Sequence, residues 1–170
     1  MPRAAFFFQI LYFPMKLATL LTTDQVMLDL KGETCNEVIP EIIDHLVFRD
    51  MLSADLKDEV VSLLKAREDE ISTGIGSGVA IPHAFSDNVD KVTACFARSS
   101  MGVDFEALDN APVNFIVLFV VPKKDYGLHL QTLAAIAKMF NNCEVRQRLQ
   151  EAETAAAIIT IFSSRPARTR

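Results

Sequence analysis

The stretch STGIGSGVAIPHAF, residues 72–85, decides how the rest of the chain is interpreted. It places three glycines before a short apolar run that ends in a proline and a histidine, His83; the glycines are Gly74, Gly76 and Gly78. Alternating glycines permit positive φ angles and close backbone approach, so that N–H groups could converge on an anion such as a phosphoryl group. A purely structural tight turn is the commoner use of such glycines and stays open as the alternative.

The composition is that of one soluble globular domain. The 170 residues are 50% hydrophobic and 23% charged, which is enough chain to bury roughly 70% of the unfolded surface. The net charge is -5 and the pI is near 5.2, and the one basic run is the tail with Arg165, Arg168 and Arg170. This balance argues against a nucleic-acid partner.

The start of the chain and the cysteines bear on location. The apolar run AAFFFQILYF is shorter than the roughly 20 residues that span a bilayer, and no clean cleavage site follows it. We expect an extension outside the fold over residues 1–14, a domain over 15–163, a basic tail over 164–170 and no membrane insertion. Cys35, Cys95 and Cys143 lie far apart without ligand spacing, so we expect reduced, buried structural thiols in a cytoplasmic protein.

Two helical patterns precede the glycine segment. Thr34 and Glu37 form a capping-box pattern ahead of apolar positions, although Pro40 suggests that this helix begins nearer Ile39. The segment SADLKDEVVSLLKARE is a clearer amphipathic helix that Ser53 can cap.

Short β-like runs follow at 79–84, 92–99 and 114–122, and the last is apolar throughout, as in a strand covered on both faces. Pro82 cannot donate to a sheet ladder, so the first strand should end there, with His83 at a strand end. Helical patterns return in LHLQTLAAIAKMF, EVRQRLQEA and TAAAIITIF. Helices on both sides of a β-rich middle predict an α/β fold, a single-domain sandwich of one sheet with helices packed on its faces.

A second histidine, His129, begins the helix that follows the last β-like run. Its spacing to Leu133, Ile136 and Phe140 puts the imidazole on the inward apolar stripe, where it needs a polar partner. The first turn of a helix carries partial positive charge and unpaired N–H groups, so it destabilises a protonated ring and binds anions. We therefore expect a neutral histidine beside an anion. A side-chain cap or a satisfied semi-buried histidine is the alternative. His45 is expected to face solvent and receives no role.

Arg67, Ser72 and Thr73 stand just upstream of the glycines. A guanidinium can bind phosphate through two parallel hydrogen bonds, and hydroxyls add donors, although an arginine at a helix end more often contacts terminal carbonyls. The sequence shows no metal-ligand cluster, no Ser/His/Asp spacing and no Walker lysine. Two histidines with these donors therefore suit a phosphoryl relay, because a neutral imidazole nitrogen can accept a phosphoryl group near neutral pH.

The segments STGIGSGVAIPHA with ARE just ahead, GVDFEALDNAPVNFIVLFVVP and GLHLQTLAAIAKMF resemble the enzyme IIA domain of the bacterial sugar phosphotransferase system, of the fructose, mannitol or nitrogen-regulatory type. The resemblance covers about residues 15–163. It implies a mixed β-sheet flanked by helices on both faces. It also implies that His83 is phosphorylated through Nε2, that His129 positions and stabilises the phosphoryl group, and that Arg67 is the site arginine, with support from Ser72, Thr73 and the three glycines.

The resemblance further implies a phosphoryl donor of the HPr type, a phosphohistidine protein, and transfer to a IIB domain, a cysteine site or use as a regulatory signal. No cofactor or metal is implied. The opening MKLATLLTTDQVMLDL resembles the nitrogen-regulatory subgroup. A separate IIA subunit of a fructose or mannitol transporter, and a regulatory binding module that carries no phosphate, are the alternatives. A nucleotide-binding enzyme is disfavoured because no phosphate-gripping lysine and no metal carboxylate pair are present.

Two positions depart from the family pattern. Ser77 stands where asparagine is common, and Phe85 stands where polar or basic residues are common. Phe85 is either buried beneath the glycine segment or an exposed apolar contact for the carrier protein, and the second is favoured.

Overall fold

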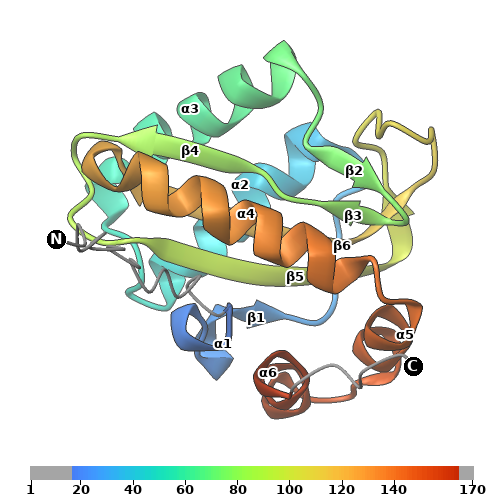
Figure 1. Ribbon diagram of the computed structural model, residues 1–170. Coiled ribbons are helices and arrows are strands. Elements are labelled where there is room, and N and C mark those ends of the chain that lie inside the picture. The colour runs from blue at the N-terminus through green and yellow to red at the C-terminus, as the bar shows by residue number, and fades with distance from the viewer. Residues whose placement is uncertain (1–16, 165–170) are drawn as a thin grey trace, which may run out of the picture.

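The computed structural model describes residues 17–164 (Figure 1). The predicted extension over residues 1–14 lies outside the described residues, as does the predicted basic tail apart from Ser164. Within residues 17–164 no helix is long and apolar enough to cross a membrane.

A six-stranded mixed sheet forms the middle layer, as the α/β sandwich prediction requires (Figure 1). Its order is β1 (Val26–Met27), β5 (Thr93–Val103), β6 (Val113–Pro122), β3 (Val79–Ala80) and β2 (Gly74–Gly76), and β4 (His83–Ser86) also pairs with β6. Strands β3 and β4 both run parallel to β6, whereas β5 is antiparallel to it. Strand β6 therefore organises the sheet, and nine of its ten residues are buried, which fits its unbroken apolar sequence.

Helices cover both faces of the sheet (Figure 1). On one face lie α2 (Cys35–Phe48) and α3 (Lys57–Glu70); on the other lie α4 (Tyr126–Phe140) and the short helices α1 (Leu17–Leu20), α5 (Cys143–Glu151) and α6 (Ala155–Ser163). Single 3₁₀ turns, η1 (Thr23–Gln25), η2 (Ala54–Leu56) and η3 (Lys123–Asp125), precede β1, α3 and α4. The predicted sandwich is confirmed.

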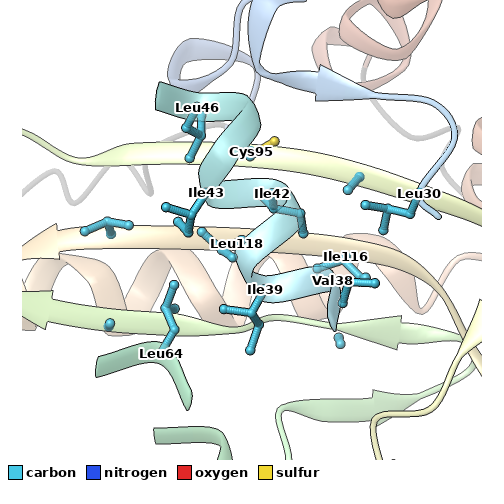
Figure 2. Packing of buried hydrophobic residues seen from close by; sticks show 14 of the residues in the cluster. Leu30, Val38, Ile39, Ile42, Ile43, Leu46, Leu64, Cys95, Ile116 and Leu118 are labelled. Carbon is cyan, nitrogen blue, oxygen red and sulfur yellow. The ribbon is translucent and has the colours of Figure 1, made fainter. Parts of the chain in front are cut away.

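The two cores follow the alternation of β6. Ile116 and Leu118 pack beneath α2, where its apolar side chains point at the sheet (Figure 2), while Phe115 and Phe119 belong to the cluster beneath α4. Successive side chains of a strand point to opposite faces, so one apolar strand supplies both cores.

Helix α2 begins earlier than Pro40 suggested. It starts at Cys35, directly after Thr34, and the Glu37 carboxylate accepts the backbone N–H of Thr34 at 3.1 Å. The expected start near Ile39 is wrong. A proline inside a helix costs about 3 kcal/mol, but α2 buries five apolar side chains, each of which contributes about 1.5–3 kcal/mol.

Pro82 interrupts the strand as predicted, but the chain then rejoins the same neighbour. Val79 pairs with Phe115 and His83 pairs with Phe119, both on β6. Across the break, the Phe119 N–H donates to the Pro82 carbonyl at 2.9 Å. His83 therefore stands at the start of a second strand, at a position fixed by β6.

The three cysteines are free thiols in unlike environments. Cys95 is buried, and burial raises the pKa of its thiol. Cys35 is half-buried and Cys143 is exposed, so the prediction of buried thiols is wrong for Cys143 and holds fully only for Cys95.

We predict that Leu118→Ala, in the core beneath α2, lowers the free energy of unfolding by about 2–5 kcal/mol, because it leaves a cavity in a fully buried layer. The control is Leu108→Ala, at a side chain that is 76% exposed, with an expected change within about 0.5 kcal/mol. Urea denaturation of both variants checks this, and equal effects would contradict the core assignment.

Candidate functional site

His83 is held in one tautomer by its own backbone. Its Nδ1 lies 2.9 Å from the carbonyl oxygen of Ile81. A carbonyl oxygen only accepts hydrogen bonds, so Nδ1 carries the proton and Nε2 keeps its lone pair. The ring is half-buried, which leaves Nε2 available as a nucleophile at the edge of the sheet.

The surroundings favour the neutral form of His83. Burial lowers the pKa of its imidazole, and the bond to the Ile81 carbonyl opposes that effect only in part. The positive charge of Arg67 lowers the pKa further, and the carboxylate of Glu68 raises it. The net direction is below the ordinary value of 6.5, so the ring is neutral at pH 7.

His129 faces His83 from the first turn of α4. The two ring centroids are 5.6 Å apart. His129 is 1% exposed, and neither of its ring nitrogens has a hydrogen-bond partner within the described part of the chain. Burial and the neighbouring His83 lower its pKa to about 4. This direction favours the neutral imidazole at pH 7, and residues 17–164 supply no polar partner, although an unpaired buried donor costs about 1–3 kcal/mol.

Aromatic rings surround the His129 imidazole. Phe119 meets it edge to face at 5.0 Å between centroids, and Phe85 does so at 5.5 Å. Tyr126 in turn packs on Phe85 at 4.9 Å. Phe85 is half-buried and packs against this cluster.

Arg67 lies in the last turn of α3, close enough for its charge to act on His83. Its Nη1 donates to the carbonyl oxygen of Ile71 at 2.8 Å. The alternative weighed from the sequence, an arginine on a helix-terminal carbonyl, is therefore the arrangement that the structure shows.

Ser72 and Thr73 are tied to other groups. The Ser72 hydroxyl donates to the Phe105 carbonyl at 2.5 Å, and the Thr73 hydroxyl donates to the Glu68 carboxylate at 2.6 Å. The backbone N–H of Thr73 also donates to Glu68, at 2.7 Å, while the Ile81 N–H donates to the Thr73 carbonyl at 3.1 Å. These bonds fix the segment beside His83, and both hydroxyl protons are engaged elsewhere.

Glu68 is a site residue that the sequence reasoning missed. It is buried on the inner face of α3, in register with Val60 and Leu64. That spacing of four was visible in the sequence and placed a carboxylate on an apolar stripe, where it needs hydrogen-bond donors.

The glycines form a hairpin. Ser77 and Gly78 have consecutive positive φ angles of 55° and 74°, as two-residue hairpin turns require, and the Ser77 N–H donates to Asp109 at 2.9 Å. Val79 and His83 pair with β6 four residues apart, which is about 13 Å along the strand. Gly76 and Gly78 therefore do not lie beside His83. Their arrangement is the purely structural tight turn that the sequence left as the alternative.

Gly74 lies nearer, in β2, where a Cβ atom would stand 2.7 Å from that of Ala107. Glycine is needed at position 74 because the neighbouring residue Ala107 leaves no room for a side chain. The described residues also contain no group of three or more His, Cys, Asp or Glu placed to hold a metal ion.

We predict a pH-dependent stability that His129 dominates. Its pKa is about 4 in the folded chain and 6.5 ordinarily, so between these values the unfolded chain binds more protons, and stability falls as the pH falls from 6.5 towards 4. When the pH is lowered from 7 to 5, the free energy of unfolding of the native chain should fall by about 2 kcal/mol more than that of the His129→Leu variant. Denaturant titrations at both pH values check this, and parallel losses would contradict it.

Comparison with known proteins gives a consistent result. The family model described as "Phosphoenolpyruvate-dependent sugar phosphotransferase system, EIIA 2" matches residues 19–165. The fructose-specific EIIA component of the phosphotransferase system of Haloferax volcanii is 34% identical over 147 residues, covering 86% of this chain and 94% of that protein.

Two solved structures show the same fold. The nitrogen regulatory protein IIA-Ntr of Neisseria meningitidis matches with a TM-score of 0.78 and 31% identity, over 86% of this chain and 98% of its own. Enzyme IIAMTL of Escherichia coli, solved in complex with phosphorylated enzyme IIBMTL, matches with a TM-score of 0.71 and 20% identity. The match covers 85% of this chain and 98% of that chain, and at this identity it shows a shared fold only. The chain therefore belongs to the EIIA 2 family of the phosphoenolpyruvate-dependent sugar phosphotransferase system.

Proposed function

We propose that this chain is a phosphocarrier in which Nε2 of His83 accepts a phosphoryl group from an HPr-type phosphohistidine protein. The observation that supports this most is the bond from Nδ1 to the Ile81 carbonyl, which leaves Nε2 unprotonated. A neutral, fixed imidazole is a competent nucleophile near neutral pH.

The transfer is a displacement at phosphorus. The P–N bond in the donor breaks, and the donor ring nitrogen keeps the electron pair. The lone pair of His83 Nε2 forms the new N–P bond, so no general base is needed. The proton on Nδ1 stays in its bond to the Ile81 carbonyl, and that oxygen stabilises the positive charge that the ring acquires.

His129 is proposed to donate its ring N–H to a phosphoryl oxygen. With a pKa of about 4 the ring stays neutral, so one of its nitrogens carries a proton and donates. A phosphoryl oxygen would give this buried donor the hydrogen bond that the described residues do not supply.

Arg67 is proposed to turn from the Ile71 carbonyl towards the phosphoryl group. It makes one hydrogen bond to that carbonyl, worth about 1 kcal/mol, and two parallel bonds to phosphate oxygens are stronger. Ser72, Thr73 and Gly74 are proposed to support the site by fixing the backbone beside His83.

The onward role is proposed as transfer to a IIB domain or use of the phosphorylated state as a regulatory signal, in the cytoplasm. The likeness to IIA-Ntr favours regulation, and the likeness to the fructose-specific component favours a separate transporter subunit as the second candidate. Transfer from HPr is common to both, so the first experiment addresses that step.

We predict that incubation with phosphoenolpyruvate, enzyme I and an HPr-type carrier gives an acid-labile, alkali-stable label. His83→Ala should abolish the label, because the acceptor nitrogen is gone. His45→Ala is the matched control and should keep it, since His45 contacts the Asp24 carbonyl through Nε2 instead. An unlabelled native chain would remove the phosphocarrier proposal, and label in His83→Ala would refute the acceptor.

We predict that His129→Ala is still labelled but transfers its phosphoryl group poorly. Loss of one oriented donor costs on the order of 100-fold in rate. The measurement is the return of label from purified phosphoprotein to unphosphorylated carrier, which requires no knowledge of the onward recipient. Return at the native rate would show that His129 has no part in the transfer.

A further inference from the structure

Phe85 is placed by the same strand that places His83. The two residues are two positions apart on β4, so their side chains lie on one face of the sheet. Phe119, the β6 partner of His83, belongs to the apolar cluster on that face. Helix α4 covers this face and adds Tyr126 and His129.

The contacts of Phe85 join these groups. Its ring lies 6.0 Å from that of His83 and 5.5 Å from that of His129, edge to face in both cases. Tyr126, which is 53% exposed, packs on Phe85, and Phe119 lies against His129. Aromatic rings thus pack around the histidine pair on the α4 side, where His129 is 1% exposed.

We propose that Phe85 is a positioning residue that screens the His83–His129 pair from water and thereby sets how long a phosphoryl group on His83 survives hydrolysis. This inference rests on the proposed function. In the hydrolysis, a water oxygen bonds to phosphorus, the N–P bond breaks, and Nε2 keeps the electron pair. The ring of Phe85 limits water to the side of His83 that is open to a docking protein.

The screen also accounts for the unusual state of His129. An imidazole whose two nitrogens have no partner among residues 17–164 stays neutral where water cannot reach it. The titratable group that acts on it is His83 from β4, and Arg67 and Glu68 of α3 act in turn on His83. The titration of His129 therefore reports on the screen without phosphorylation.

The test compares Phe85→Ser, which opens the screen, with Phe85→Leu, which keeps it apolar. Phe48→Ser, at a side chain that is 79% exposed, is the control. Tyr126→Ser removes the outer ring only and keeps the test valid if Phe85→Ser fails to fold. Two quantities are measured: the lifetime of the purified phosphoprotein and the pKa of His129 by NMR of the unphosphorylated protein.

We expect Phe85→Ser to shorten the lifetime several-fold and to raise the His129 pKa by a unit or more from about 4. Tyr126→Ser should change both in the same direction by less, and Phe85→Leu and Phe48→Ser should stay near the native values. A native lifetime in Phe85→Ser, or an equal loss in Phe85→Leu, would overturn the proposal. If neither the native chain nor any variant takes up label, the proposed function fails. An unchanged His129 pKa in Phe85→Ser would then refute the screen independently.

Discussion

The hydrogen bond from His83 Nδ1 to the Ile81 carbonyl is the constraint on which the site depends. It exists because Pro82 breaks the strand between β3 and β4, so the Ile81 carbonyl lies between the two paired segments. Strand β6 pairs with both segments and fixes where the break occurs. One proline thus determines which ring nitrogen of His83 is protonated and which keeps its lone pair.

The two faces of β6 have separate tasks. Beneath α2 the sheet packs in a cluster of mostly aliphatic side chains that also holds Cys95 and Phe105 (Figure 2), and no histidine belongs to this cluster in the described chain. Beneath α4 the corresponding layer contains His129 and aromatic rings, and it leaves the nitrogens of that imidazole without partners in the described chain. Buried polar groups are nearly always paired in folded proteins, so an unpaired buried imidazole beside His83 is a candidate position for a ligand.

The sequence predicted the layers and most of the elements, because these depend on periodicity and on residue type, and it singled out the two histidines whose rings the fold places 5.6 Å apart. It misjudged Pro40, since the burial of α2 as a whole outweighs one lost hydrogen bond. The resemblance implied that the three glycines support the phosphoryl site, whereas the hairpin at Ser77 and Gly78 places Gly76 and Gly78 away from His83, through φ angles and pairing partners that no local pattern specifies. The contacts of Phe85 with Tyr126 of the distant helix α4 could not be placed without the fold, whereas the spacing of Glu68 from Val60 and Leu64 was visible in the sequence and was missed.

The most direct test of this account is NMR of the imidazole nitrogens of His83, before and after phosphorylation. The bond to the Ile81 carbonyl predicts a protonated Nδ1 in the resting protein, and the proposed transfer predicts phosphorus bonded to Nε2 afterwards. A resting tautomer protonated at Nε2, or a phosphoryl group on Nδ1, would contradict the central claim that the break at Pro82 selects the reactive nitrogen.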